Sequence, residues 1–225
     1  MQMGCTIHAG RRMWAGPPGK RQNLTALPAF RSGGRQALLR VLHAAPDIGN
    51  IDVLVNGLPL FRNAAYRELS AFAPVASGLS RIDILKANGN RSPLLTVQYH
   101  LMPAGHYTAG MTGTLSKPLP IVMSDRMPVP PGERSMRFVH LSPDAPALDL
   151  AIKKGPVLFA NIPFANASHY ISCPFEKNEL EIRAAGTETV LLNIPKVDFQ
   201  YGQSVTFYCT GYMNGTPSLE ILKAP

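Results

Sequence analysis

One short polar pattern occurs twice in the 225-residue chain. Each copy reads Arg-x-x-His-x-x-Pro-Asp, with a second Asp after four more residues, and the copies lie 97 positions apart. If the intervening turn folds back, the imidazole and the two carboxylates of one copy could hold a divalent metal ion. Imidazole suits zinc or manganese, and carboxylates suit harder ions. The candidate metal ligands are His43, Asp47, Asp52, His140, Asp144 and Asp149.

The same residues have a structural interpretation. In this interpretation each Asp caps its own turn and each His hydrogen-bonds a backbone carbonyl group. Repetition of the pattern favours this reading, because both copies need the turn. The sequence also lacks a Gly-x-Ser-x-Gly elbow, a Gly-x-Gly-x-x-Gly loop and a Walker loop. We therefore expect no catalytic residues, no bound cofactor and no enzymatic activity.

The elements around the pattern are short strands and tight turns. Leu38–His43 is an apolar run typical of a buried strand, and residues 46–50 carry the Pro, Asp and Gly of a turn. The next strand is predicted at Ile51–Val55. Asn56-Gly57 then gives a strong hairpin signal.

The second copy repeats this order, so the chain is predicted to hold two similar modules. Each module offers about seven short strands, a turn roughly every ten residues and no amphipathic helix, as in an immunoglobulin-like β-sandwich. The predicted fold class is all-β, with two tandem sandwiches behind a basic, largely irregular leader. The predicted boundaries are 1–36 for the leader, 37–126 for the first module, 127–135 for a Pro-rich linker and 136–225 for the second module.

The charge is unevenly placed along the chain. The net charge is +8, and residues 1–46 contribute seven Lys or Arg and no acid. The basic character therefore belongs to the N-terminal part, which could contact an acidic partner such as nucleic acid, anionic lipid or an acidic polymer. The alternative is a solvated, disordered leader.

The cysteines and the hydropathy pattern exclude some protein classes. Cys5, Cys173 and Cys209 are too few and too scattered for a disulfide framework. Cys173 and Cys209 could meet across the second sandwich, or both could be buried free thiols. No apolar run approaches the roughly 20 residues of a membrane-spanning helix, and the N-terminus lacks the apolar segment of a secretory signal.

A family resemblance adds to this reading. The repeated pattern is followed by a strand with Asp, a turn and Phe-x-Asn, and later by a β-run that ends in Thr112-Gly113 or Thr210-Gly211. In these features the chain resembles an uncharacterised bacterial family, the domain of unknown function 4397, over about 38–124 and 136–223. Members are often tandem and usually carry export signals. The resemblance implies envelope or surface modules without known catalysis.

These observations predict a non-enzymatic structural or interaction protein of a bacterial envelope or surface layer. Its expected partner is a protein or an envelope polymer. The alternative is a ligand- or metal-binding protein that uses the repeated His/Asp loops.

Overall fold

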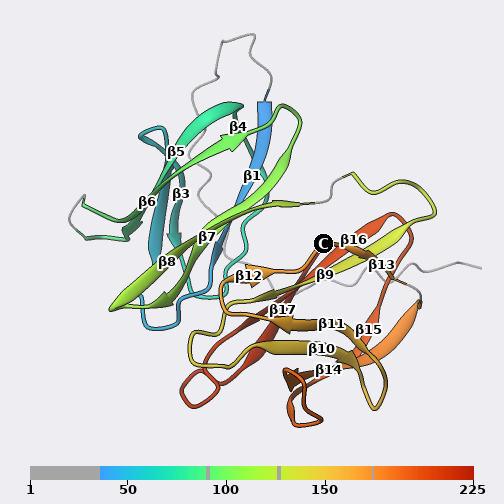
Figure 1. The fold of residues 1–225 in the computed structure, drawn as a ribbon. Helices are drawn as coiled ribbons and strands as arrows, with labels where there is room; N and C mark the ends of the chain where they lie inside the picture. Colours follow the sequence, from blue (N-terminus) through green and yellow to red (C-terminus); the bar gives the residue numbers. More distant parts are fainter. Residues whose placement is uncertain (1–35, 90–91, 126–127, 174) are drawn as a thin grey trace, which may run out of the picture. The chain divides into compact units, whose positions relative to one another are not determined.

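The computed structural model describes residues 36–89, 92–125, 128–173 and 175–225, all of which lie in a single compact unit (Figure 1). They form strands and turns but no α-helix, which confirms the all-β prediction. The predicted leader, apart from Gln36, lies outside the described residues, and so does Cys5. The described part of the chain contains no α-helix, and so it has no helix that could span a membrane.

The first sandwich consists of two four-stranded sheets. Its strands are β1 (Gln36–His43), β2 (Ile51–Val55), β3 (Leu58–Ala64), β4 (Ala73–Ala76), β5 (Gly78–Lys86), β6 (Pro93–Leu101), β7 (His106–Thr114) and β8 (Lys117–Asp125). One sheet has the order β4-β1-β7-β8, with β1 and β7 parallel, and the other has the order β3-β2-β5-β6. A single apolar core joins them, for example through Val41, Val53 and Ile84.

The second sandwich repeats this arrangement. Its strands are β9 (Arg134–His140), β10 (Leu148–Ile152), β11 (Val157–Ile162), β12 (Asn166–Ala167), β13 (Ile171–Ser172), β14 (Lys177–Ala184), β15 (Val190–Asp198), β16 (Gln203–Thr210) and β17 (Glu220–Ala224). One sheet has the order β12-β9-β16-β17, with β13 also paired to β9, and the other has the order β11-β10-β14-β15. Strands β9 and β16 are parallel, like β1 and β7. The two sandwiches therefore share one strand order.

Local sequence accounts for most of these elements. Asn56 and Gly57 have positive φ values of 51° and 79°, as the hairpin turn between β2 and β3 requires. Strand β15 was missed by sequence reasoning. It is an edge strand that contains Pro195, a residue that weakens a strand signal because it cannot donate a ladder hydrogen bond.

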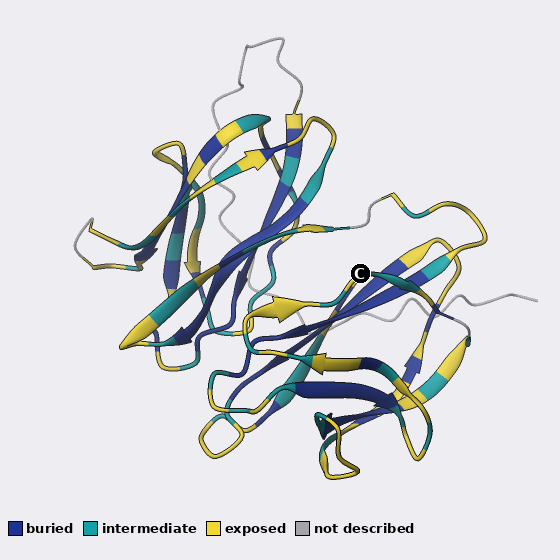
Figure 2. Ribbon diagram, viewed as in Figure 1, coloured by how far each residue is buried: buried dark blue, intermediate teal, exposed yellow. Residues whose placement is uncertain are grey.

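The two sheets of each sandwich differ in burial (Figure 2). We call β4-β1-β7-β8 and β12-β9-β16-β17 the inner sheets, and the other two the outer sheets. Strand β16 of an inner sheet is buried at every position after its first, whereas β15 of an outer sheet is mostly exposed or half-buried. The inner sheets also share a third apolar core from both sandwiches, made of Leu42, Ala44, Ile121, Val139, Leu141, Tyr208 and Ala224. The central strands of the inner sheets, β1, β7, β9 and β16, are therefore covered on both faces, whereas the edge strand β8 is mostly exposed or half-buried.

Candidate functional site

The repeated pattern lies at matching places in the two sandwiches. Its Arg and His are on β1 in the first sandwich and on β9 in the second, the central strands that pair in parallel with β7 and β16. The first Asp of each copy lies in the turn after that strand, and the second Asp lies on the next strand, β2 or β10. Backbone topology thus places the two copies of the pattern equivalently.

The two motif histidines bind backbone groups. Nε2 of His43 lies 3.0 Å from the carbonyl oxygen of Ile48, and Nε2 of His140 lies 2.9 Å from that of Pro146. Nδ1 of each ring accepts a backbone N–H two residues ahead, from Ala45 in one copy and Ser142 in the other. Both rings are fully buried.

An aromatic ring also packs edge-on against each histidine, Tyr66 in the first sandwich and Phe164 in the second. Burial lowers the pKa of both His43 and His140 below 6.5, more than the carbonyl contacts raise it. At neutral pH each imidazole is therefore uncharged and holds the loop that follows its strand.

The first motif aspartates hold a loop distant in sequence. Asp47 Oδ2 accepts the N–H of Leu115, in the β7–β8 hairpin, at 3.0 Å. Asp144 accepts the N–H groups of Met213 and Asn214, which follow β16, at 2.7 and 2.9 Å. The prediction that each Asp caps its own turn did not include these contacts to a distant loop. Topology brings the turn after the first strand beside the end of the parallel strand, where free N–H groups need an acceptor.

Asp144 keeps some local contacts as well. Its Oδ1 accepts the Ser142 hydroxyl at 3.3 Å. Burial acts to raise the pKa of Asp144, but the N–H groups of Asn214 and Met213 and the Ser142 hydroxyl outweigh it, so the pKa lies below its ordinary value. The ionised carboxylate is thus the form that fits this loop.

The second motif aspartates fix the bulge that follows on the neighbouring strand. Asp52 accepts the N–H of Asn63 at 2.8 Å, and Asp149 accepts the N–H of Asn161 at 2.6 Å. Asn63 and Asn161 have φ values of 57° and 52°, the left-handed region that asparagine tolerates. Asp149 also accepts the N–H of Gly186 at 3.0 Å, so it holds β11 and the turn after β14 to its own strand.

The six candidate metal ligands are thus engaged by backbone groups. Among the described residues, no group of three or more His, Cys, Asp or Glu side chains is arranged to hold a metal ion.

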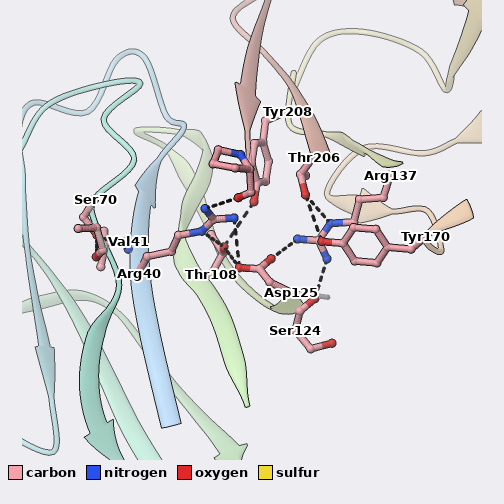
Figure 3. Close-up of polar contacts among 12 residues, drawn as sticks. Arg40, Val41, Ser70, Thr108, Ser124, Asp125, Arg137, Tyr170, Thr206 and Tyr208 are labelled. Atoms are coloured by element: carbon pink, nitrogen blue, oxygen red, sulfur yellow. Dashed lines mark hydrogen bonds and ion pairs between the residues drawn. The ribbon is translucent and has the colours of Figure 1, made fainter. Parts of the chain in front are cut away.

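A second polar cluster joins the sandwiches, and sequence reasoning did not assign it a role (Figure 3). Asp125, at the end of β8, forms ion pairs with Arg40 of the same sandwich, at 3.2 Å, and with Arg137 of the other sandwich. All three side chains are at most 5% exposed. Asp125 thus supplies one carboxylate to two buried guanidinium groups. Such a buried ion pair stabilises the fold only when the other N–H groups of the arginines are also hydrogen-bonded.

The remaining donors of the two arginines are bonded in matching ways. Nε of Arg40 donates to Thr108 Oγ1, and Nε of Arg137 donates to Thr206 Oγ1. Each guanidinium group also lies 4.6 Å from the centre of an aromatic ring, Phe72 for Arg40 and Tyr170 for Arg137. Equivalent strands therefore build the same cradle around the motif arginine in both sandwiches.

Each arginine also reaches across to the other sandwich. Nη1 of Arg137 donates to the carbonyl oxygen of Ser124 at 2.7 Å, and Nη1 of Arg40 donates to that of Pro225 at 2.8 Å. Both motif arginines lie inside apolar strands. A charged residue in such a strand is the sequence signal that could have indicated this cluster. A buried charge needs a partner.

The two described cysteines are free and lie in the core of the second sandwich. Burial raises the pKa of Cys209 to about 12, and burial also raises the pKa of Cys173. Of the two alternatives for this pair, the structure therefore has the buried free thiols, in their unreactive protonated form.

Fold and site define a class of protein. It is an all-β protein of two sandwiches in which the motif His and Asp side chains hold backbone loops and the motif Arg side chains connect the sandwiches. A family model described as a domain of unknown function (DUF4397) matches residues 37–151, and the chain belongs to this family. The match is a single copy that covers the first sandwich and ends within β10.

No curated protein matches the chain. Among solved structures, the Bacillus anthracis TIE protein is similar at 8% sequence identity and a TM-score of 0.26. The comparison covers 79% of this chain and 34% of that chain, so this chain spans about a third of its length.

Proposed function

We propose that the protein is a non-enzymatic structural or interaction protein of a bacterial envelope or surface layer, built from two copies of the DUF4397 module. The observation that carries the proposal is the use of the repeated polar residues. Each motif histidine and aspartate holds a backbone loop, and each motif arginine holds the neighbouring sandwich. Because the motif His, Asp and Arg side chains all make structural contacts, they fit a structural protein better than an enzyme.

Support for a second copy of the module comes from equivalent contacts. His43 and His140 each bind a carbonyl group in the loop after their own strand. Asp52 and Asp149 each accept the N–H of an asparagine with positive φ. The two sandwiches also share one strand order. The proposed modules are 37–126 and 136–225, joined by the linker 127–135.

The location is proposed from the family resemblance, because members of that family usually carry export signals. Cell fractionation of the source bacterium, followed by immunoblotting, tests it. We expect the protein in the envelope fraction and a partner that is a protein or an envelope polymer. Recovery in the soluble cytoplasmic fraction alone would contradict the proposal.

Thermal melting tests the structural role against the metal-binding alternative. The protein is melted with EDTA and with added Ca²⁺, Mn²⁺ or Zn²⁺, beside His140→Ala and Asp144→Ala variants. A ligand that binds only the native state raises the melting temperature. We expect no shift with any metal and a clear destabilisation by Asp144→Ala. A rise that either substitution abolishes would favour metal binding instead.

A further inference from the structure

The two sandwiches meet through the same face of each, the outward face of the inner sheet. Thr112 Oγ1 on β7 donates to the carbonyl oxygen of Leu141 at 2.8 Å, and Thr210 Oγ1 on β16 donates to that of Ala44 at 3.2 Å. These contacts exchange equivalent positions, as do the two arginine contacts to Ser124 and Pro225. The interface is therefore nearly isologous, like that of a two-fold symmetric dimer.

Three contacts break this near-symmetry, and the first involves Glu220 of β17. Glu220 accepts the Tyr66 hydroxyl at 2.9 Å and forms an ion pair with Arg67 at 3.0 Å. Strand register makes Leu119 the equivalent of Glu220, because Glu220 pairs with Thr210 as Leu119 pairs with Thr112. A pair of two first sandwiches would therefore place Leu119 where this carboxylate sits.

The same exchange fails for two copies of the second sandwich. Tyr66 corresponds to Phe164, since both rings pack against the motif histidine. Arg67, the residue after Tyr66, corresponds to Ala165. Glu220 would then face a phenyl ring and a methyl group, which offer no donor for a carboxylate.

The second contact is the ion pair of Asp125 with Arg137 across the interface. The acid comes from the first sandwich and serves one arginine from each side. The third contact is made by Tyr208, a fully buried side chain whose hydroxyl donates to Thr108 Oγ1 at 3.4 Å. The equivalent position on β7 is Gly110. Two second sandwiches would bring together two tyrosines here, and two first sandwiches would bring none.

We propose that the outward face of the first inner sheet is a docking surface whose partner is the second sandwich of this chain, selected against another copy of the first sandwich. The tether raises the local concentration of that partner, but side-chain complementarity chooses it. The inference concerns pairing within the molecule and does not depend on the proposed cellular location.

Cleavage of the linker in the folded protein tests this pairing. A specific protease site is inserted between Pro131 and Gly132, both exposed, and the intact chain is cleaved after purification. We expect the two fragments to elute together and to appear as a one-to-one complex in native mass spectrometry. Separation or aggregation of the fragments after cleavage would overturn the proposal, and so would homodimers of either fragment.

Glu220→Leu, which installs the residue of the equivalent position, tests the selection itself. Loss of the hydrogen bond and ion pair of a partly buried carboxylate is expected to weaken the cleaved complex about tenfold or more. Glu179→Gln on the outer sheet, which loses an exposed ion pair with Lys153, is the matched control and should leave the dissociation constant unchanged. The melting temperature of each uncleaved variant verifies folding. Equal dissociation constants for Glu220→Leu and the control would overturn the selection.

Discussion

A central strand of an inner sheet, β16, and an edge strand of an outer sheet, β15, lie in different surroundings. On the outer sheet, β15 buries only Ile194 and Val197, in keeping with one wet face. On the inner sheet, β16 buries every residue after its first, including Thr206 and Thr210. The polar residues of an inner strand face another sandwich rather than water. Polar alternation in a strand therefore does not by itself identify a solvent-exposed face.

The buried charges show the same difference. On the second outer sheet, Arg183 pairs with Glu181 of its own strand at 2.6 Å. On the inner sheets, Arg40 and Arg137 share one acid contributed by β8. The outer pair is local, whereas the inner cluster is complete only when both sandwiches are folded and docked, because Arg137 comes from the second sandwich. Mutations on the two kinds of sheet should therefore have different consequences.

The largest effect is expected for Asp125→Ala. The substitution leaves two buried guanidinium groups without their acid, and removal of one partner from a buried ion pair costs about 3–5 kcal/mol. Chemical denaturation at pH 7 measures the loss in the free energy of unfolding. Asp198→Ala, which removes an exposed carboxylate 3.9 Å from Lys177, is the control and should change little. Similar losses for the two variants would contradict a bridging role for Asp125.

A smaller effect should separate the two second motif aspartates on the outer sheets. Asp149 accepts two backbone N–H groups and is buried, whereas Asp52 has one such contact, to Asn63. We expect Asp149→Ala to cost about 2 kcal/mol and Asp52→Ala about 1 kcal/mol, since each lost charged acceptor leaves a donor unsatisfied. Denaturant midpoints of both variants test the order. An equal or reversed order would show that the extra contact to Gly186 contributes nothing.

The inner-sheet histidines should make stability depend on pH. Burial lowers the pKa of His43 and His140 in the folded state below the ordinary 6.5, so the unfolded chain takes up protons first as the pH falls. Stability is then fully present above pH about 6.5 and declines below it, by at most about 1.4 kcal/mol per pH unit for each histidine.

Chemical denaturation between pH 7.5 and about 5 measures this decline. His100→Gln, which alters an exposed histidine on outer strand β6, should keep the full slope. A flat profile for the wild-type protein across this range would refute the role assigned to the buried rings.

The smallest effect is expected at the outer-sheet surface. Lys153 and Glu179 form an ion pair at 2.6 Å, but their side chains are 42% and 49% exposed. Exposed pairs gain little because water screens them and both side chains lose freedom. Lys153→Ala should melt at the temperature of the wild-type protein in differential scanning calorimetry. A drop comparable to that of Asp125→Ala, on the inner sheet, would show that outer and inner polar contacts do not differ as described.

Sequence reasoning reached the local features of this fold. The turn at Asn56-Gly57 and the short strands follow from patterns within about ten residues, and the repeat follows from comparing two such stretches of the chain. The structure confirms the all-β sandwich class. The carbonyl group of Ile48, which the His43 ring contacts, also lies close to His43 in sequence. The partners of Asp47 and Asp144 were out of reach, since each lies almost 70 residues away in the chain.

Only the tertiary structure decided what the motif arginines do. Arg40 and Arg137 each lie on a strand, where side chains point alternately to the two faces of the sheet. A polar side chain on one face is compatible with contact to water or with contact to another sandwich. Asp125 stands at the end of an ordinary edge strand, and nothing near it in the chain indicates two arginine partners. Strand periodicity is a local property of the backbone. The choice between water and a second sheet depends on packing between residues far apart in the chain, which local periodicity does not encode.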